Sequence, residues 1–232
     1  MSIIVNGTIA KNVVFNGKNV LLVKNKKLTE IFKKVGIMWT KSDITSGGFR
    51  GGARYANDLW VACGDNGLWW SEDGKTWTQS NITSGGFYGG ARYANGLWVA
   101  CGASDNGLWW SEDGKTWTKS NITSGYFDGG ARYANGLWVA CGYGDNGLWW
   151  SEDGKTWTQS NISSKSFAGG ARYANGLWVA CGYSDNGLWW SEDGKTWTQS
   201  NITSGDFYGG ARYANGLWVA CGDNGLYYSE QI

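Results

Sequence analysis

The stretch Ala91-Arg-Tyr-Ala-Asn-Gly-Leu-Trp-Val-Ala-Cys-Gly102 decides the fold, because it recurs along the whole chain. Its copies begin at Ala53, Ala91, Ala131, Ala171 and Ala211, so they are spaced by 38, 40, 40 and 40 residues. The first copy differs only at Asp58, where the other copies have Gly. A second string, Gly-Leu-Trp-Trp-Ser-Glu-Asp-Gly-Lys-Thr-Trp-Thr, begins at Gly67, Gly107, Gly147 and Gly187, and a shortened copy begins at Gly225. A fixed period of about 40 residues indicates one supersecondary unit repeated five times.

Each repeat predicts four short antiparallel strands joined by tight turns. In the second copy we expect strands at residues 90–94, 97–101, 108–111 and 115–120. Asn95-Gly96 is typical of a type I′ hairpin turn between the first two strands. Glycines every few residues disfavour helices. Four antiparallel strands in about 40 residues make one blade of a β-propeller.

The sequence therefore predicts an all-β fold, a five-bladed β-propeller of four-stranded blades. The blades are expected at about residues 50–84, 88–122, 128–162, 168–202 and 208–232, the last completed by residues 36–44. The fifth repeat stops after its third strand, and Gly36-Ile-Met-Trp-Thr-Lys-Ser42 resembles the missing fourth strand. Pairing of residues 36–44 with the C-terminal blade would close the ring and cover an open sheet edge. An open solenoid is the alternative architecture.

Residues 1–35 form a separate N-terminal segment. Val13 to Val23 has the pattern of a β-hairpin around Asn16-Gly17. The segment carries seven Lys and one Glu, a net charge of +6, whereas the rest of the chain has 13 basic and 18 acidic residues, a net charge of −5. The acidic body disfavours nucleic-acid binding through phosphate neutralisation. The segment is expected to pack on the propeller or on another protein.

Composition excludes several classes of protein. The chain has no His and no Pro, so a Ser-His-Asp triad, a His-ligated zinc site and a collagen-like fold are all impossible. No apolar run approaches the ~18 residues of a membrane span, and the N-terminus lacks the features of a signal peptide. We expect cytoplasmic synthesis, no cofactor and no metal site. The five Cys, one per repeat, alternate with apolar residues and are expected to be buried.

The string Ser71-Glu-Asp-Gly-Lys-Thr-Trp77, repeated from Ser111, Ser151 and Ser191, resembles the Asp-box of sialidase-like propellers. It lacks the single residue that the Asp-box has between Asp and Gly. The resemblance implies a propeller fold of the kind found in bacterial and phage surface proteins, with the box as a structural turn away from any active site. The cadence of residues 12–23 is similar to strand pieces of prophage tail and baseplate proteins, which implies a virion association. Five blades also resemble the tachylectin-type lectins in architecture.

The repeated arginines are candidate ligand-binding residues. Arg54, Arg92, Arg132, Arg172 and Arg212 fall on the expected innermost strands and would line a central channel. A ring of five equal groups could bind an anion or an acidic sugar, whereas acid–base catalysis needs unequal groups. The alternative is that each Arg stacks on a neighbouring Trp or bonds to carbonyl groups of the strand. The chain is therefore expected not to be an enzyme, and a sialidase-like glycosidase is the least favoured function.

The copies differ mainly in two loops that should share one face of the propeller. These are the connection between blades and the turn between the second and third strands. The candidate ligand-binding residues there are Arg50, Tyr88, Tyr126, Asp128, Tyr143, Tyr183, Asp206 and Tyr208. Tyr, Ser and Gly suit adaptable recognition surfaces. The alternative is that exposed loops drift without consequence.

These patterns predict a monomeric, non-enzymatic binding module with five sites for surface glycans, on a phage tail or cell surface. Weak repeated sites gain by avidity. One alternative is a structural or protein-interaction scaffold that joins a larger assembly through residues 1–35. Another is a recently amplified or engineered repeat protein without an evolved ligand. We expect no nucleic-acid partner and no membrane partner.

Overall fold

The computed structural model describes residues 13–15, 18–20, 38–44 and 47–229. The chain divides into two compact units, Met1–Lys41 and Ser42–Ile232. The boundary follows Lys41, whereas the sequence pattern placed it after residue 35. Among the described residues no helix is long and apolar enough to cross a membrane.

The first unit contains a two-stranded antiparallel sheet, formed by β1 (Val13–Phe15) and β2 (Lys18–Val20). Val13 pairs with Val20 and Phe15 pairs with Lys18. These strands confirm the predicted hairpin. Its turn at Asn16-Gly17 and its extension to Val23 lie outside the described residues.

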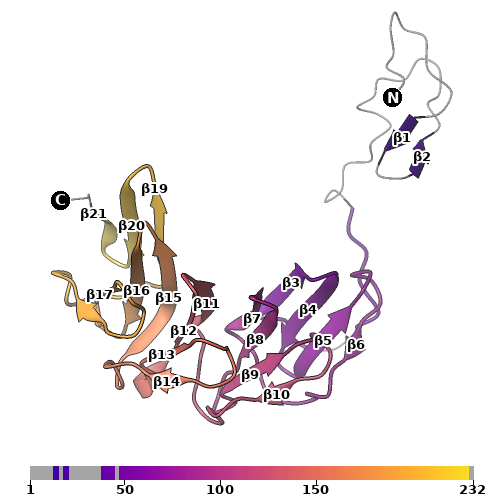
Figure 1. The fold of residues 1–232 in the computed structure, drawn as a ribbon, viewed down its shortest axis with the longest axis horizontal. Helices are drawn as coiled ribbons and strands as arrows, with labels where there is room; N and C mark the ends of the chain where they lie inside the picture. Colours follow the sequence, from indigo (N-terminus) through magenta and orange to yellow (C-terminus); the bar gives the residue numbers. More distant parts are fainter. Residues whose placement is uncertain (1–12, 16–17, 21–37, 45–46, 230–232) are drawn as a thin grey trace, which may run out of the picture. The chain divides into compact units, whose positions relative to one another are not determined.

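The second unit consists of five antiparallel sheets that follow one another along a curve (Figure 1). The first two sheets contain β3 (Gly52–Ala56), β4 (Leu59–Gly64), β5 (Gly67–Ser71), β6 (Thr78–Gln79), β7 (Gly90–Ala94), β8 (Leu97–Cys101), β9 (Leu108–Ser111) and β10 (Thr118–Lys119). The third and fourth contain β11 (Gly130–Ala134), β12 (Leu137–Cys141), β13 (Leu148–Ser151), β14 (Thr158–Gln159), β15 (Ser166–Ala174), β16 (Leu177–Tyr183), β17 (Leu188–Ser191) and β18 (Thr198–Gln199). The fifth contains β19 (Ala211–Ala214), β20 (Leu217–Gly222) and β21 (Gly225–Ser229). A 3₁₀ turn, η1 (Gly144–Asn146), precedes β13. The all-β class and the five blades are confirmed.

The repeated sequence sets the strand register as expected. In the second sheet Arg92 pairs with Val99 and Ala94 pairs with Leu97. Asn95 has φ 51° and Gly96 has φ 76°, the left-handed values that a type I′ turn requires. The fourth strand is shorter than predicted, since only Thr118–Lys119 pairs where residues 115–120 were expected.

A turn stabilised by side chains takes the place of the missing part of the fourth strand. The Ser111 hydroxyl donates to Asp113 Oδ1 at 2.9 Å and accepts the N–H of Gly114 at 2.8 Å. The same Asp113 oxygen accepts the backbone N–H groups of Lys115 and Thr116. These bonds hold the chain in a turn until Thr118. They show that the Ser-Glu-Asp-Gly-Lys-Thr-Trp string acts here as a structural turn.

In the second, third and fourth sheets, the tryptophan just before the fourth strand fills the space between that sheet and the preceding one. Trp117 is 2% exposed and packs with Leu59 and Val61 of the first sheet and Trp98 of the second. The same positions bury Trp157 between the second and third sheets and Trp197 between the third and fourth. The apolar cores of the second unit therefore lie between the sheets, as propeller blades require.

An asparagine clamps the backbone of each of these tryptophans. The Asn81 side chain accepts the Trp117 N–H on Oδ1 and donates from Nδ2 to the Trp117 carbonyl, both at 2.8 Å. Asn121 and Asn161 make the same two bonds to Trp157 and Trp197. We call each such pair a Trp–Asn clamp. The clamps join consecutive blades at a fixed position.

Four of the five cysteines occupy the expected core positions, and the expectation is wrong for the fifth, whose blade has no further blade packed against it in the described part of the chain. Cys63, Cys101, Cys141 and Cys181 are buried, and Cys221 of the fifth sheet is exposed. Burial raises the pKa of the Cys101 thiol to about 12, so it stays a thiol at neutral pH. The four buried cysteines act as small apolar residues.

The fifth sheet differs from the sequence prediction at its outer edge. It has three strands in the described part of the chain, in the order β19-β20-β21, and residues 38–44 form no strand. Residues 36 and 37 lie outside the described residues. The predicted pairing of residues 36–44 with this blade is thus not among the observed pairings. This pairing would join the two ends of the repeat array. Because these ends are far apart in the sequence, no hairpin turn fixes the register of the pairing.

The glycine one residue before β3, β7 and β11 (Gly51, Gly89 and Gly129) allows close approach of the next blade. A Cβ at Gly129 would lie 2.2 Å from the Phe167 carbonyl oxygen and 2.6 Å from Cys141 Cβ. We expect Gly129→Ala to lower the stability of the protein by roughly 1–3 kcal/mol or more, because backbone must move to admit the methyl group. Thermal unfolding by circular dichroism measures this loss.

Gly136→Ala is the matched control. A Cβ at Gly136 meets nothing within 4 Å, so only its left-handed φ of 74° is strained, at about 1–2 kcal/mol. A Gly129→Ala protein that melts at or above the temperature of Gly136→Ala would contradict the close-packed interface.

Candidate functional site

The two variable loops lie on one face because backbone hydrogen bonds join them. The Tyr143 N–H, in the turn after β12, donates to the Tyr126 carbonyl in the connection before β11 at 2.7 Å. In the second blade the Ala103 N–H donates to the Gly86 carbonyl at 2.8 Å. The loops in which the repeats differ are therefore neighbours on the same face of each blade.

The aromatic side chains of these loops form one continuous row across the blades. Consecutive ring centroids are 6.5 Å apart for Tyr88 and Tyr126, 4.9 Å for Tyr126 and Tyr143, 5.3 Å for Tyr143 and Tyr183, and 4.6 Å for Tyr183 and Tyr208. The Arg50 guanidinium extends the row, 5.2 Å above the ring of Tyr88. We call these six residues the tyrosine row. Each is half-buried or exposed, so ring faces and hydroxyls remain accessible to solvent.

The tyrosine row is a single surface and not five separate sites. Tyr143 and Tyr183 stack with an interplanar angle of 20°, whereas the other pairs are tilted or edge-on. A hydrogen bond to the Tyr183 hydroxyl raises the pKa of both Tyr143 and Tyr208. Rings held by their neighbours lose little conformational entropy when a ligand binds. The variable loops of successive blades therefore present one continuous aromatic surface.

The two predicted acidic residues have different environments. Asp206 Oδ1 accepts the Asp185 N–H at 2.7 Å, and its carbonyl accepts the Asp223 N–H at 3.0 Å, so Asp206 ties three loops together. Asp128 is half-buried close to Tyr126, and burial raises the pKa of its carboxyl group. Of the two acidic residues that the sequence singled out on this face, Asp128 is therefore the one that is available to contact a ligand.

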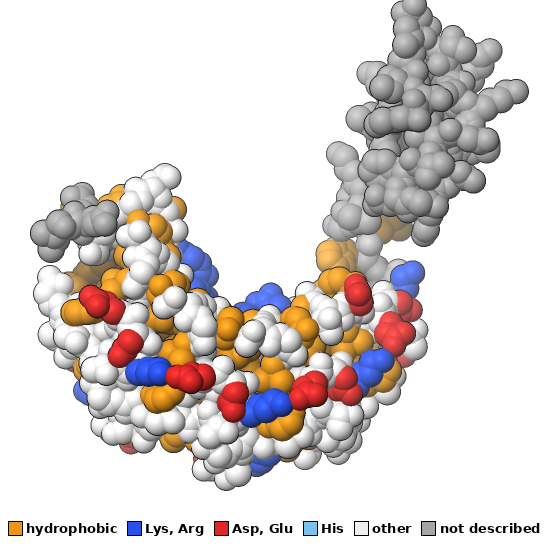
Figure 2. Space-filling model, viewed as in Figure 1, with side chains coloured by type: hydrophobic (Ala, Val, Ile, Leu, Met, Phe, Trp, Pro, Cys, Tyr) orange, Lys and Arg blue, Asp and Glu red, His pale blue; other side chains and the backbone are white. Residues whose placement is uncertain are grey.

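The five repeated arginines lie on the first strands of the five sheets. Neighbouring first strands contact one another, from β3 to β7, β11, β15 and β19. Figure 2 shows Lys and Arg side chains in blue along the concave edge of the second unit. Nη1 of Arg92, Arg132, Arg172 and Arg212 donates to the carbonyl of the preceding Ala, at 2.8–3.1 Å. The predicted bonds to strand carbonyls are thus present.

Positive charge accumulates along this arginine row, which we define as Arg54, Arg92, Arg132, Arg172 and Arg212. Burial, reinforced by Arg172 and Arg92, lowers the pKa of Arg132 to about 9, which still leaves it cationic at neutral pH. No ion pair joins any of the five to an acidic side chain in the part of the chain that the structure describes. Like charges held close together without counter-charges favour the binding of an anion.

The opposite face carries a repeated ion pair at the structural turns. The Lys115 ammonium lies 2.8 Å from Glu72 Oε1 and 4.3 Å from the centroid of the Trp70 ring in the preceding blade. Lys155 and Lys195 make the same two contacts with the blades before them. These ion pairs join neighbouring blades, and they occupy the ammonium groups of the three lysines. Among the described residues no group of three or more Cys, Asp or Glu side chains could hold a metal ion.

Sequence reasoning missed the asparagines of the Trp–Asn clamps. Asn81, Asn121 and Asn161 were treated as part of a connection, although Ser-Asn-Ile follows every complete fourth strand. Asn stays the same at this position in every repeat although the loop that follows it varies, and this retention is the signal that could have identified the clamps.

Comparisons with known proteins concern the fold. No protein-family model matches the chain, and no curated protein matches it. BamB from Moraxella catarrhalis is similar in structure with a TM-score of 0.52 and 7% identity, over 75% of this chain and 56% of BamB. The computationally designed Ika8 protein has a TM-score of 0.43 and 7% identity, over 77% of this chain and 70% of Ika8. The computationally designed Ika4 protein has a TM-score of 0.42 and 8% identity, over 60% of this chain and 88% of Ika4. At these identities the likeness to BamB supports the blade architecture and carries no function.

The Asp128 carboxyl group predicts a pH-dependent difference in stability. The pKa of Asp128 is raised in the folded protein, so its cost to stability is absent below the unfolded value of about 4, grows as pH rises from that value to the folded one, and is complete above it. We expect Asp128→Asn to raise the melting temperature at pH 7 and to leave it unchanged near pH 3. The exposed Asp105 supplies the control substitution Asp105→Asn, which should show no such pH-dependent gain. A lower melting temperature for Asp128→Asn at pH 7 would contradict the inference that burial of the Asp128 carboxylate destabilises the folded protein.

Proposed function

We propose that this protein is a non-enzymatic binding module for surface glycans. The observation that supports the proposal is the tyrosine row, in which the variable side chains of five repeats meet as one aromatic surface. A framework copied almost without change varies where Tyr and Asp are presented on one face. Rigid aromatic rings with polar hydroxyls give large contact area at low entropic cost, which suits a hydroxyl-rich ligand with apolar ring faces.

The arginine row favours an acidic glycan over a neutral one. The tyrosine row and the arginine row belong to the same blades, since Tyr88 lies four residues before Arg92 and Tyr208 four before Arg212. A ligand that stacks on the tyrosines can extend a carboxylate or sulfate toward the guanidinium groups. Because the five arginines are chemically equal, they supply attraction and not acid–base catalysis.

The resemblance to Asp-box propellers supports a surface setting for this module. As part of the proposal, residues 1–35 attach the module to a larger virion or cell-surface assembly. A surface-attached module presents its aromatic face in many copies, so weak glycan contacts gain by avidity.

Removal of a central tyrosine should weaken glycan binding. We expect Tyr143→Ala and Tyr183→Ala each to reduce affinity roughly fivefold or more, because both rings contact two neighbours of the row. A glycan array identifies the ligand, and isothermal titration measures the affinity of each variant. Tyr55→Ala is the matched control, since Tyr55 is 53% exposed but lies on β3 outside the row. Absence of glycan binding at high protein concentration would favour the scaffold and would overturn the proposal.

The charge of the ligand can be tested separately. We expect Arg132→Gln to weaken the binding of a sialylated oligosaccharide and to leave its neutral counterpart unchanged, since only the acidic sugar has a charge to lose. Added salt should weaken the wild-type affinity for the acidic sugar, because the Debye length falls from ~10 Å at 0.1 M to ~3 Å at 1 M. Equal loss for both sugars would show that Arg132 acts on the structure of the site and not on charge.

A further inference from the structure

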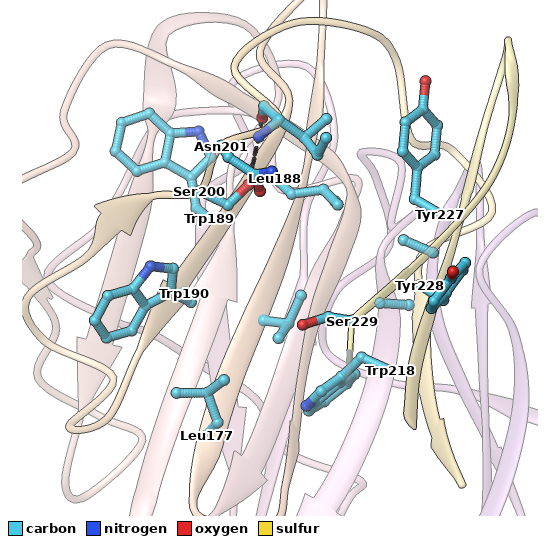
Figure 3. A pocket seen from close by; sticks show the side chains of 14 residues that line it. Leu177, Leu188, Trp189, Trp190, Ser200, Asn201, Trp218, Tyr227, Tyr228 and Ser229 are labelled. Atoms are coloured by element: carbon cyan, nitrogen blue, oxygen red, sulfur yellow. Dashed lines mark hydrogen bonds between the residues drawn. The ribbon is translucent and has the colours of Figure 1, made fainter. Parts of the chain in front are cut away.

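An apolar pocket of about 200 Å³ lies between the fourth and fifth sheets, within the second unit. Figure 3 shows Leu177, Trp189 and Trp190 of the fourth sheet on one side and Trp218 and Tyr228 of the fifth on the other. A dry apolar cavity of roughly 150 Å³ can hold a benzene ring, so this pocket has room for one aromatic side chain. We call it the fourth–fifth pocket.

The three preceding interfaces show what fills such a pocket. Between the first and second sheets Trp117 packs against Val61 and Trp98, which correspond by the repeat to Val179 and Trp218. Trp98 is 0% exposed, whereas Trp218 is half-buried. An extended segment that carries a tryptophan is therefore the occupant to which the shape of this pocket corresponds.

The rim of the pocket carries groups that bind the backbone of a tryptophan. Asn201 corresponds to Asn81, Asn121 and Asn161, each of which bonds to the N–H and the carbonyl of the tryptophan in the next blade. Within the described residues no hydrogen bond involves the Asn201 amide. Asn201 thus offers one donor and one acceptor in the place where a Trp–Asn clamp forms elsewhere.

A place for a cation lies beside the pocket. At the first interface Lys115, two residues before the buried tryptophan, contacts the Glu72 carboxylate and the ring of Trp70. The corresponding residues of the fourth sheet are Glu192 and Trp190. Trp190 is 37% exposed, and no ion pair involves Glu192 in the part of the chain that the structure describes. An acidic group and an aromatic face are therefore available to a lysine at the same spacing.

The third strand of the fifth sheet offers an edge to an extended peptide. Among the described strands β21 pairs with β20 alone, whereas β9 pairs on its other side with Thr118–Lys119. The same register would place the residue after a bound tryptophan opposite Tyr228 and the next residue opposite Tyr227. Free strand edges bind extended segments through backbone hydrogen bonds.

We propose that the fourth–fifth pocket binds an extended segment of a partner protein in which a lysine precedes a tryptophan by two residues. The tryptophan ring enters the pocket, and its backbone N–H and carbonyl bond to Oδ1 and Nδ2 of Asn201. The lysine ammonium contacts Glu192 and the ring of Trp190, and the residues after the tryptophan pair with β21. Backbone bonds to the strand edge give affinity, and the two side-chain positions give selectivity for Lys-x-Trp.

A synthetic peptide with the sequence of residues 154–160, Gly-Lys-Thr-Trp-Thr-Gln-Ser, tests the proposal on the full chain. Fluorescence anisotropy of the labelled peptide measures its Kd. We expect saturable binding, and we expect the Trp157→Ala peptide to bind roughly tenfold more weakly or worse, because it leaves the apolar pocket unfilled.

A pair of protein variants tests the clamp. Asn201→Ala should weaken binding of the peptide roughly fivefold, because it removes two hydrogen bonds. Asn161→Ala is the matched control and should leave the Kd unchanged, since Asn161 belongs to an interface already filled by Trp197.

The lysine contact is tested by combining a peptide variant with a protein variant. The Lys155→Ile peptide and the Glu192→Gln protein should each weaken binding about threefold, and together they should weaken it no further. Glu152→Gln is the control, because Glu152 already pairs with Lys195. Additive losses, equal affinity of Asn201→Ala and wild type, or absence of saturable binding would each overturn the proposal. The last result would mean that residues of the same chain or a second copy fill the pocket.

Discussion

The packing of one tryptophan between each pair of sheets is the interaction on which the rest of the structure depends. Four-stranded sheets of this size bury little by themselves, and their apolar faces are covered only by their neighbours. The tryptophan supplies the apolar volume, and the asparagine clamp fixes the position of its backbone. Because the clamp is the same at each complete interface, it determines the position of one blade relative to the next. The loops on the variable face are brought together as a consequence.

The tyrosine row illustrates how a structural repeat can produce a functional surface that is not itself repeated. Tyr88 and Tyr208 come from connections between blades, whereas Tyr143 comes from the turn between the second and third strands. No two neighbouring blades contribute the same pair of loop residues, yet the rings are in contact. A regular scaffold therefore carries an irregular surface, which is the division between framework and loops that recognition proteins commonly use. The arginine row has the opposite character, since it is as regular as the strands that carry it.

Much of this architecture could be predicted from the sequence, because the repeat reports the blade directly. The Asn95-Gly96 turn, the register of Arg92 with Val99 and the buried cysteines follow from local patterns of residues. The clustering of Tyr126, Tyr143 and Tyr183 was only partly predictable, because a pattern places loops on one face but does not give the distances between rings. The clamp role of Asn81 depends on a bond across 36 residues, which no local pattern encodes. The short fourth strand follows from competition by the Asp113 side chain for backbone N–H groups, which propensity alone does not reveal.

The central claim is that one clamp fixes each complete interface between blades. Amide hydrogen exchange of the full chain tests it most directly, through the backbone N–H of Trp157. Because Asn121 bonds this group, Asn121→Ala should raise the exchange rate of the Trp157 N–H and leave the N–H groups of Trp117 and Trp197 protected. Unchanged protection of the Trp157 N–H in Asn121→Ala would contradict the account.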